Sequence, residues 1–125
     1  FCEAAGVEIP ESFQGTSLLP LLHGETPPDW PREAFSTYNG QQFGLYTQRM
    51  IRDARWKYVW NMTDVDELYY MDSDPWEMTN LVARPDVADI LADLRCRLLA
   101  SLEARGDRTV KAMWAQNQLA RGCIL

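Results

Sequence analysis

Apolar and polar residues alternate in the middle of the chain, a pattern typical of β-strands. In residues 55–61 the aromatic side chains share one face and the remaining side chains the other: Trp56, Tyr58 and Trp60 against Arg55, Lys57 and Val59. Strand signals recur in three further segments: residues 34–38, 45–52 and 68–71. The Asp53-Ala54 link is short enough for a hairpin. We therefore predict an antiparallel meander of about four strands, whose aromatic face another element must cover.

A helical repeat of apolar residues follows the strands. Spacings of three and four place six side chains on one stripe: Val87, Ile90, Leu91, Leu94, Leu98 and Leu102. Pro85 suits the first helical position, and we expect Gly106 to end the helix. Asp93 and Arg97 are spaced to form an ion pair one turn apart. This helix, packed on the sheet, makes an α+β fold with a small antiparallel sheet covered by a C-terminal amphipathic helix.

Weaker helical signals lie on either side of this unit. Residues 108–119 favour a second helix, in which we expect Trp114 to pack within the chain, with an oligomer contact as the alternative. Residues 16–22 favour a short helix capped by Thr16 or Ser17 and stopped by Gly24. The leucines of that short helix cover most of its surface, so we expect it to dock on another part of a protein.

Composition and charge exclude several classes of protein. A formal net charge of −6 argues against a nucleic-acid binder, which normally carries a basic stripe. No apolar run approaches the roughly 20 residues that a membrane-spanning helix needs. Three widely spaced cysteines form no C-x-x-C pair, so we expect three thiols and neither a zinc site nor a disulfide framework. The chain lacks an initiator methionine and a signal sequence, so we expect it to begin inside a larger protein.

Two sequence blocks carry a family resemblance. Residues 67–81 read ELYYMDSDPWEMTNL, which predicts a strand, a tight turn at Asp74-Pro75 and the beginning of a helix. Residues 49–61 read RMIRDARWKYVWN, a hairpin followed by an aromatic-lysine-tyrosine strand. In this order, after the leucine-rich segment, the blocks resemble the C-terminal subdomain of the sulfatases, within the alkaline-phosphatase-like superfamily. Tyr70-Met71 stands where many relatives have Asp-Leu, a difference that a strand tolerates.

The resemblance implies an organisation in three parts. Residues 1–33 correspond to the end of a catalytic domain and its connecting segment, 34–107 to the C-terminal subdomain, and 108–125 to a helical extension. It also implies a parent enzyme that hydrolyses a carbohydrate or small-molecule sulfate ester. Such an enzyme uses a calcium-type divalent ion and a formylglycine made from Cys or Ser. We expect the missing catalytic domain to be the partner of this chain.

The chemistry of that family needs residues that this chain lacks. The Cys/Ser-x-Pro-x-Arg motif of the nucleophile is absent, and the chain has one histidine, His23. We therefore predict no catalytic residue and no metal ligand among these 125 residues, and no activity from them alone. Two alternatives remain: the C-terminal part of a related phosphodiesterase or phosphonate hydrolase, and a stand-alone protein-interaction module.

The loop of residues 38–44 is the candidate for substrate contact. It joins two strands and is rich in amides that hydrogen-bond hydroxyl groups. In sulfatases the corresponding region reaches the rim of the active-site cleft. The resemblance therefore implies substrate-binding roles for Tyr38, Asn39 and Gln41, and for Arg49, which could face an anionic group. An ordinary surface loop is the alternative.

Several other polar residues suggest sites but fit simpler roles. The pairs Asp64/Asp66 and Asp72/Asp74 look like calcium ligands, yet the sixth position counted from Asp72 is not the glycine that a calcium loop needs. We expect these aspartates to serve turns and caps. Residues 61–63 form a glycosylation acceptor sequence, for which a polar turn is the alternative. We expect His23 to interact with a helix C-terminus.

Overall fold

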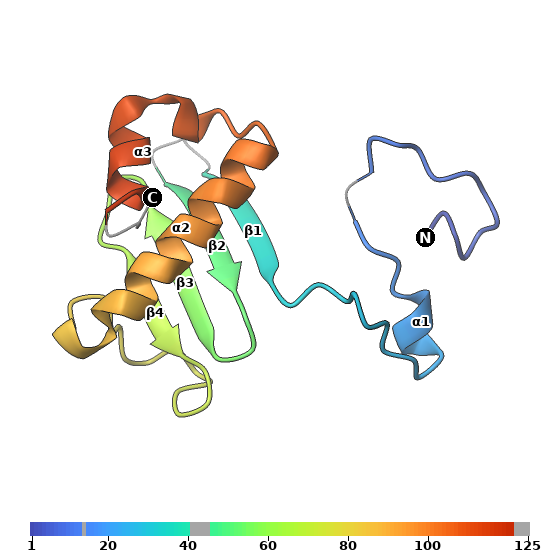
Figure 1. Cartoon of the computed structure of the whole chain (residues 1–125), viewed down its shortest axis with the longest axis horizontal. Helices are drawn as coiled ribbons and strands as arrows, with labels where there is room; N and C mark the ends of the chain where they lie inside the picture. The colour runs from blue at the N-terminus through green and yellow to red at the C-terminus, as the bar shows by residue number, and fades with distance from the viewer. Residues whose placement is uncertain (14, 41–45, 122–125) are drawn as a thin grey trace. The chain divides into compact units, whose positions relative to one another are not determined.

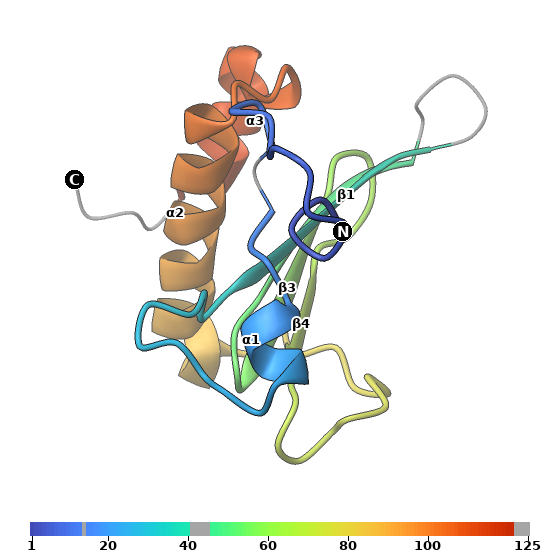
Figure 2. The same ribbon diagram turned by 90° about the vertical axis from the view of Figure 1, so that its right-hand side faces the viewer.

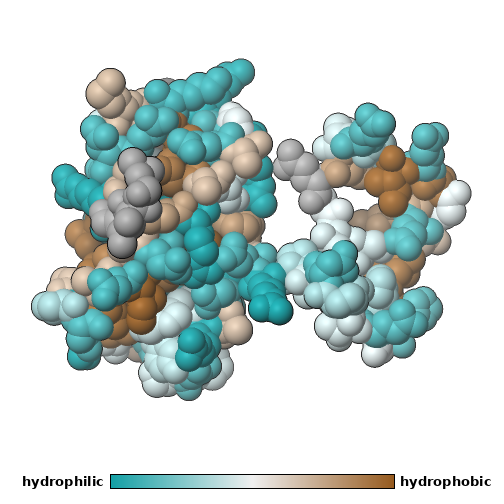
Figure 3. All heavy atoms as spheres, in the orientation of Figure 1, coloured by the Kyte–Doolittle hydropathy of each residue, from teal (hydrophilic) through white to brown (hydrophobic). Residues whose placement is uncertain are grey.

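The computed structural model describes residues 1–13, 15–40 and 46–121, which form two units, Phe1–Pro31 and Arg32–Leu125. The first unit contains one short helix, α1 (Leu19–Leu22). Leu18 occupies the N-cap position in place of the predicted Thr16 or Ser17, although Ser17 Oγ still accepts a hydrogen bond from the Leu19 N–H. Several large apolar side chains of this unit are exposed, and Figure 3 shows hydrophobic residues at its surface.

The second unit is built on a four-stranded antiparallel sheet. The strands are β1 (Ala34–Asn39), β2 (Thr47–Arg52), β3 (Trp56–Asn61) and β4 (Glu67–Tyr70), and they pair in the order β1-β2-β3-β4 (Figure 1). This arrangement confirms the predicted meander. The register places Ile51 opposite Tyr58, and Tyr58 opposite Leu68. Because opposed residues share a face, these three side chains lie together on one side of the sheet.

One helix covers that side of the sheet. A 3₁₀ turn, η1 (Pro85–Val87), leads into α2 (Ala88–Ala104), and Figure 2 shows α2 packed along one face of the strands. The four buried residues of α2 all belong to the predicted stripe: Leu91, Leu94, Leu98 and Leu102. They form one core cluster with the sheet residues Ile51, Tyr58, Trp60 and Leu68. The α+β architecture predicted from the periodicity is therefore confirmed.

The C-terminal segment belongs to the same core. It consists of η2 (Thr109–Lys111) and α3 (Met113–Leu119), and it contributes buried residues to the cluster: Val110, Ala115 and Leu119. Trp114 is 49% exposed, so the expectation that it packs within the chain is wrong. Ala115 and Leu119, four residues apart, occupy the buried face of the short helix, and Trp114 lies beside that face.

Arg97 on α2 connects three separate segments through ion pairs. Its guanidinium contacts Glu33 before β1, Asp53 in the β2–β3 turn at 3.0 Å, and Asp93 one helical turn earlier at 2.9 Å. The predicted pair with Asp93 is therefore present. Burial raises the pKa of Asp53, but hydrogen bonds from two backbone N–H groups and from Arg97 outweigh it and hold that pKa below its usual value.

A polar network crosses the opposite face of the sheet. Gln48 Nε2 donates to Asn61 Oδ1 at 2.6 Å, Asn61 Nδ2 donates to Glu67 Oε1 at 3.0 Å, and the Tyr69 hydroxyl donates to Glu67 Oε2 at 2.9 Å. Three strands are thereby linked by side chains as well as by their backbones. Asn61 is buried and its amide is engaged, as expected of a polar residue at a turn.

Two of the cysteines differ in their chemical state. Cys96 is disulfide-bonded and Cys2 is a free thiol, so the expectation of three thiols is wrong. Sequence spacing does not determine which cysteines meet in space, which is why the pattern could not show this.

Among the described residues, no helix has both the length and the apolar character needed to cross a bilayer.

Candidate functional site

The predicted substrate residues lie at one end of the β1–β2 pair. Tyr38 and Asn39 are the last two residues of β1, pair with Gln48 and Thr47, and are exposed. Gln41 lies outside the described residues. As consecutive residues of one strand they project their side chains to opposite faces of the sheet, and both are exposed at its end.

Gly40 closes this end of the strand pair. Its φ of 24° is positive, and a Cβ atom on it would lie 3.0 Å from the backbone nitrogen of Tyr46. Real Cβ atoms approach backbone atoms this closely only at a steric cost, so the close approach favours glycine. The end of β1 is thereby tied in place immediately after Asn39.

Arg49 differs in its environment from the exposed candidates. Its position in β2 is opposite Trp60, so it lies on the face of the sheet that α2 covers, and it is only 3% exposed. Its Nη1 donates to the backbone carbonyl oxygens of Tyr38 at 3.2 Å and Gln48 at 2.8 Å. The anionic group that Arg49 faces belongs to the chain itself: it is the carboxylate of Asp107.

The Arg49–Asp107 ion pair is bidentate, with two nitrogen–oxygen contacts. Arg49 Nε lies 2.7 Å from Asp107 Oδ2, and Nη2 donates to Oδ1 at 3.3 Å. Thr109 donates two further hydrogen bonds to Oδ1, from its backbone N–H at 2.8 Å and its hydroxyl at 2.6 Å. Partial burial raises the pKa of Asp107, but Arg49 and Thr109 outweigh it and lower the pKa to about 2. The carboxylate is therefore ionised at neutral pH.

Asp107 is held by the end of α2. The Gly106 N–H donates to Glu103 O at 2.9 Å and the Asp107 N–H donates to Leu102 O at 2.9 Å, while Gly106 has a φ of 65°. These two bonds form a Schellman motif, which fixes the residue after the glycine relative to the helix. Gly106 thus ends the helix as predicted. The role of Asp107 was missed, because its partner is 58 residues away and no local pattern connects them.

The segment of residues 72–82 has a structural role. The Glu77 N–H donates to Asp74 O at 3.1 Å, which closes the predicted turn, and the Asp74 carboxylate accepts the N–H groups of Met78 at 3.0 Å and Thr79 at 2.8 Å. Asn80 Oδ1 accepts the N–H of Leu68, so the segment is also tied to β4. The side chains of Asp74 and Asn80 therefore bind backbone groups.

Two apolar side chains project from the same segment. Trp76 is 83% exposed and Met78 is 82% exposed, whereas Glu77 between them pairs with Lys57 at 2.5 Å. Glu77 has a φ of 57°, in the left-handed region that costs a non-glycine residue free energy. The ion pair ties the segment between Trp76 and Met78 to β3.

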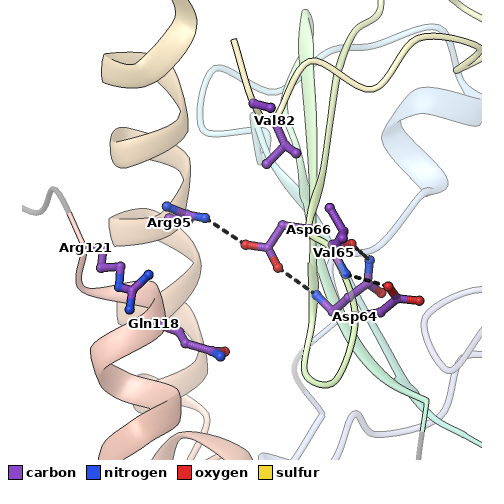
Figure 4. A pocket seen from close by; sticks show the side chains of 9 residues that line it. Asp64, Val65, Asp66, Val82, Arg95, Gln118 and Arg121 are labelled. Carbon is purple, nitrogen blue, oxygen red and sulfur yellow. Dashed lines mark hydrogen bonds and ion pairs between the residues drawn. The ribbon is translucent and has the colours of Figure 1, made fainter. Parts of the chain in front are cut away.

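A polar cavity of about 340 Å³ lies between the β3–β4 connection and the helices α2 and α3 (Figure 4). Figure 4 shows Arg95 of α2 reaching Asp66, at 2.8 Å, and Asp66 Oδ2 also accepts the Tyr58 hydroxyl at 2.7 Å. Burial and the Asp66 charge raise the pKa of Tyr58 above its usual value, so its hydroxyl stays protonated. With its acceptors engaged, Asp66 links the connection to α2 and is poorly suited to act as a general base.

The resemblance implies a divalent metal ion, and such an ion needs several oxygen, nitrogen or sulfur ligands close together. Within residues 1–13, 15–40 and 46–121, no group of three or more His, Cys, Asp or Glu side chains is arranged to hold a metal ion. The aspartates of the suspected calcium pairs instead bind neighbouring groups: Asp64 accepts the Val65 N–H, and Asp72 accepts the Tyr70 hydroxyl.

Comparisons with known proteins identify relatives of this chain among the sulfatases. The model of the family described as N-sulphoglucosamine sulphohydrolase, C-terminal, matches residues 1–104. An N-acetylglucosamine-6-O-sulfatase of Bacteroides thetaiotaomicron is 35% identical over 98 residues, covering 70% of this chain and 17% of that enzyme.

Two solved structures share the fold. A putative sulfatase of Bacteroides thetaiotaomicron superposes with a TM-score of 0.77 at 31% identity, covering 89% of this chain and 24% of that protein. A phosphonate monoester hydrolase of Silicibacter pomeroyi superposes with a TM-score of 0.72 at 28% identity, covering 87% and 24%. The chain thus spans about a quarter or less of the length of each of these relatives. It belongs to the family of sulfatase C-terminal domains, within the alkaline-phosphatase-like superfamily.

Proposed function

We propose that this chain is the C-terminal part of an enzyme that hydrolyses sulfate esters. The observation that carries the proposal is the family match along residues 1–104, in a chain without the nucleophile motif of a sulfatase. On this view the catalytic domain of the same protein holds the formylglycine and a calcium-type divalent ion. The 125 residues alone are then inactive, because a scaffold without a nucleophile cannot form the intermediate.

The subdomain acts by packing against the catalytic domain and completing one wall of the substrate pocket. Support comes from the asymmetry of the sheet. The helices α2 and α3 lie on one side of it in Figure 2, and the other side carries the network of Gln48, Asn61 and Glu67. The exposed Trp76 and Met78 offer apolar surface for such a contact.

The substrate is a sulfated carbohydrate in this proposal. Relatives in the comparisons carry the names N-acetylglucosamine-6-O-sulfatase and Delta 4,5-hexuronate-2-O-sulfatase, both of which name sugar substrates. Tyr38 and Asn39 contact the sugar, since hydroxyl and amide groups at an exposed strand end suit hydrogen bonds to its hydroxyl groups. Gln41 is given the same role from its amide side chain alone. Arg49 is buried beneath them and contributes to binding by holding the Tyr38 carbonyl.

The experiment uses the full-length protein that carries this chain, assayed with N-acetylglucosamine-6-O-sulfate. We expect Asn39→Ala and Gln41→Ala each to lower kcat/KM by about tenfold, the effect of roughly one lost hydrogen bond to substrate. The matched control is Asn117→Ala, which removes an exposed amide from α3. No turnover of any sulfate ester by the full-length protein would overturn the proposal. An unchanged kcat/KM in both loop variants would remove these residues from the substrate site.

A second candidate is a phosphonate monoester hydrolase, favoured by the structural likeness to such enzymes. Both activities need the same kind of C-terminal subdomain, so this chain alone does not separate them. The discriminating measurement is the ratio of kcat/KM for 4-nitrophenyl sulfate to that for 4-nitrophenyl phenylphosphonate with the full-length protein. A ratio well above one supports the sulfatase, and a ratio well below one supports the hydrolase.

A further inference from the structure

We propose that Asp107 is a positioning residue for substrate recognition, which acts through Arg49 on the end of β1. This inference rests on the proposed function, which assigns substrate contacts to Tyr38 and Asn39. Asp107 itself touches no substrate. Its role is to hold the strand end that presents those side chains.

The connection consists of direct contacts only. Asp107 is fixed to the end of α2 by its backbone bond to Leu102 O, and its carboxylate binds two nitrogens of Arg49. The third guanidinium nitrogen, Nη1, donates to the Tyr38 carbonyl. One planar group therefore joins the C-terminal end of α2 to the next-to-last residue of β1, and its fork geometry fixes both distance and orientation.

Removing the carboxylate would leave a cation in a buried position. The Arg49 side chain is 4% exposed and the Asp107 side chain 13%. An unpaired buried guanidinium is unstable, so it would turn toward water and release the Tyr38 carbonyl. Asn39, one residue further along and followed by the closely packed Gly40, would then lose its fixed position.

Asp107 lies just beyond residues 1–104, the segment that the family model matches. The support for the strand end is thus supplied from outside the matched segment, by the turn that leads into η2. This arrangement allows the last residue of the subdomain to influence sugar binding without contacting the sugar.

The test compares two substrates in the full-length protein. N-acetylglucosamine-6-O-sulfate carries the sugar hydroxyl groups that the strand end is proposed to bind, and 4-nitrophenyl sulfate lacks them. We expect Asp107→Asn to lower kcat/KM for the sugar sulfate by about tenfold, mainly through KM, and to change kcat/KM for the aryl sulfate less than about twofold. Asp107→Glu, which keeps the charge, should recover part of the loss. Asp86→Asn, which breaks the exposed pair with Arg84, is the matched control.

Each outcome decides the inference. If Asp107→Asn lowers kcat/KM equally for both substrates, the enzyme is only less folded. If kcat/KM for both substrates equals that of the native protein, Asp107 has no role in recognition. Either result overturns the inference. If Asp107→Asn does not fold, the same ratio is measured for Arg49→Lys, which keeps the charge but lacks the fork that binds Asp107 and the Tyr38 carbonyl together, and an unchanged ratio there overturns the inference. If Asn39→Ala lowers the sugar kcat/KM while Asp107→Asn does not, this inference fails and the proposed function stands. If Asn39→Ala has no effect, the proposed substrate contact fails.

Discussion

Trp60 Nε1 donates a hydrogen bond of 2.9 Å to Oε1 of Gln118, which lies 58 residues further along the chain. Trp60 is at the centre of the core in β3, whereas Gln118 belongs to α3, beyond the residues that the family model matches. The C-terminal segment therefore satisfies the one polar atom of the largest core side chain. It is an integral part of the fold.

This relationship predicts the effect of removing Gln118. Gln118→Ala leaves the buried indole N–H of Trp60 without its acceptor, so we expect a loss of about 1–3 kcal/mol in the free energy of unfolding. Gln116→Ala, on the same helix but without such a bond among the described residues, should change it by less than about 0.5 kcal/mol. Urea unfolding measures both values. Equal effects of the two substitutions would contradict a specific role for the bond.

Arg97 should contribute more to stability than an exposed arginine. Arg97→Ala removes the link between Glu33, Asp53 and Asp93, so we expect a loss of about 1–2 kcal/mol, kept low by the partial exposure of the side chain. The control is Arg84→Ala, whose solvent-exposed pair with Asp86 predicts a clearly smaller loss. Thermal or urea unfolding of both variants compares them. A larger loss for the Arg84 variant would contradict this assignment.

The lowered pKa of Asp107 predicts that the free energy of unfolding depends on pH. Its pKa is lowered to about 2 in the folded state, below the 3.8 that is usual for an aspartate, so the folded state favours the ionised form. The stabilisation is fully present above the unfolded pKa and is lost as pH falls through the folded pKa. It amounts to roughly 2 kcal/mol by linkage. We expect the difference in unfolding free energy between the native protein and Asp107→Asn to shrink as pH falls from 5 to about 2.

The same measurement carries its own control. Other carboxylates titrate in this range, but they are present in both proteins and cancel in the difference. Asp86→Asn, in the exposed pair with Arg84, should give a small difference with little dependence on pH. A difference for Asp107→Asn that is constant from pH 5 to 2 would show that the carboxylate is not selectively stabilised in the folded state.

Two glycines with positive φ should respond differently to alanine. Gly106→Ala meets no atom within 4 Å, so it carries only the backbone cost of about 1–2 kcal/mol. Gly40→Ala also forces its Cβ to 3.0 Å from the Tyr46 nitrogen, so we expect it to cost about 1–2 kcal/mol more. Urea unfolding of the two variants tests the order. If Gly106→Ala proves the more destabilising, the close approach at Gly40 is not a constraint.

The secondary structure could be predicted from the sequence because its causes are local. Alternation in β3 put Tyr58 and Trp60 on the buried face, and the three-and-four spacing in α2 selected Leu91 and Leu98. The turn at Asp74 and the helix stop at Gly106 follow from the conformational preferences of single residues. The family match, too, was visible in the order of these local blocks.

Only the tertiary structure decided which distant residues meet. The sequence identified Arg49 as a cation near the candidate loop, but its partner Asp107 follows a helix that begins 39 residues later, and no spacing rule connects them. The exposure of Trp114 depended in the same way on which face of α3 meets the core. Periodicity fixes the face that an element buries, whereas the pairing of charges between elements depends on how those elements pack.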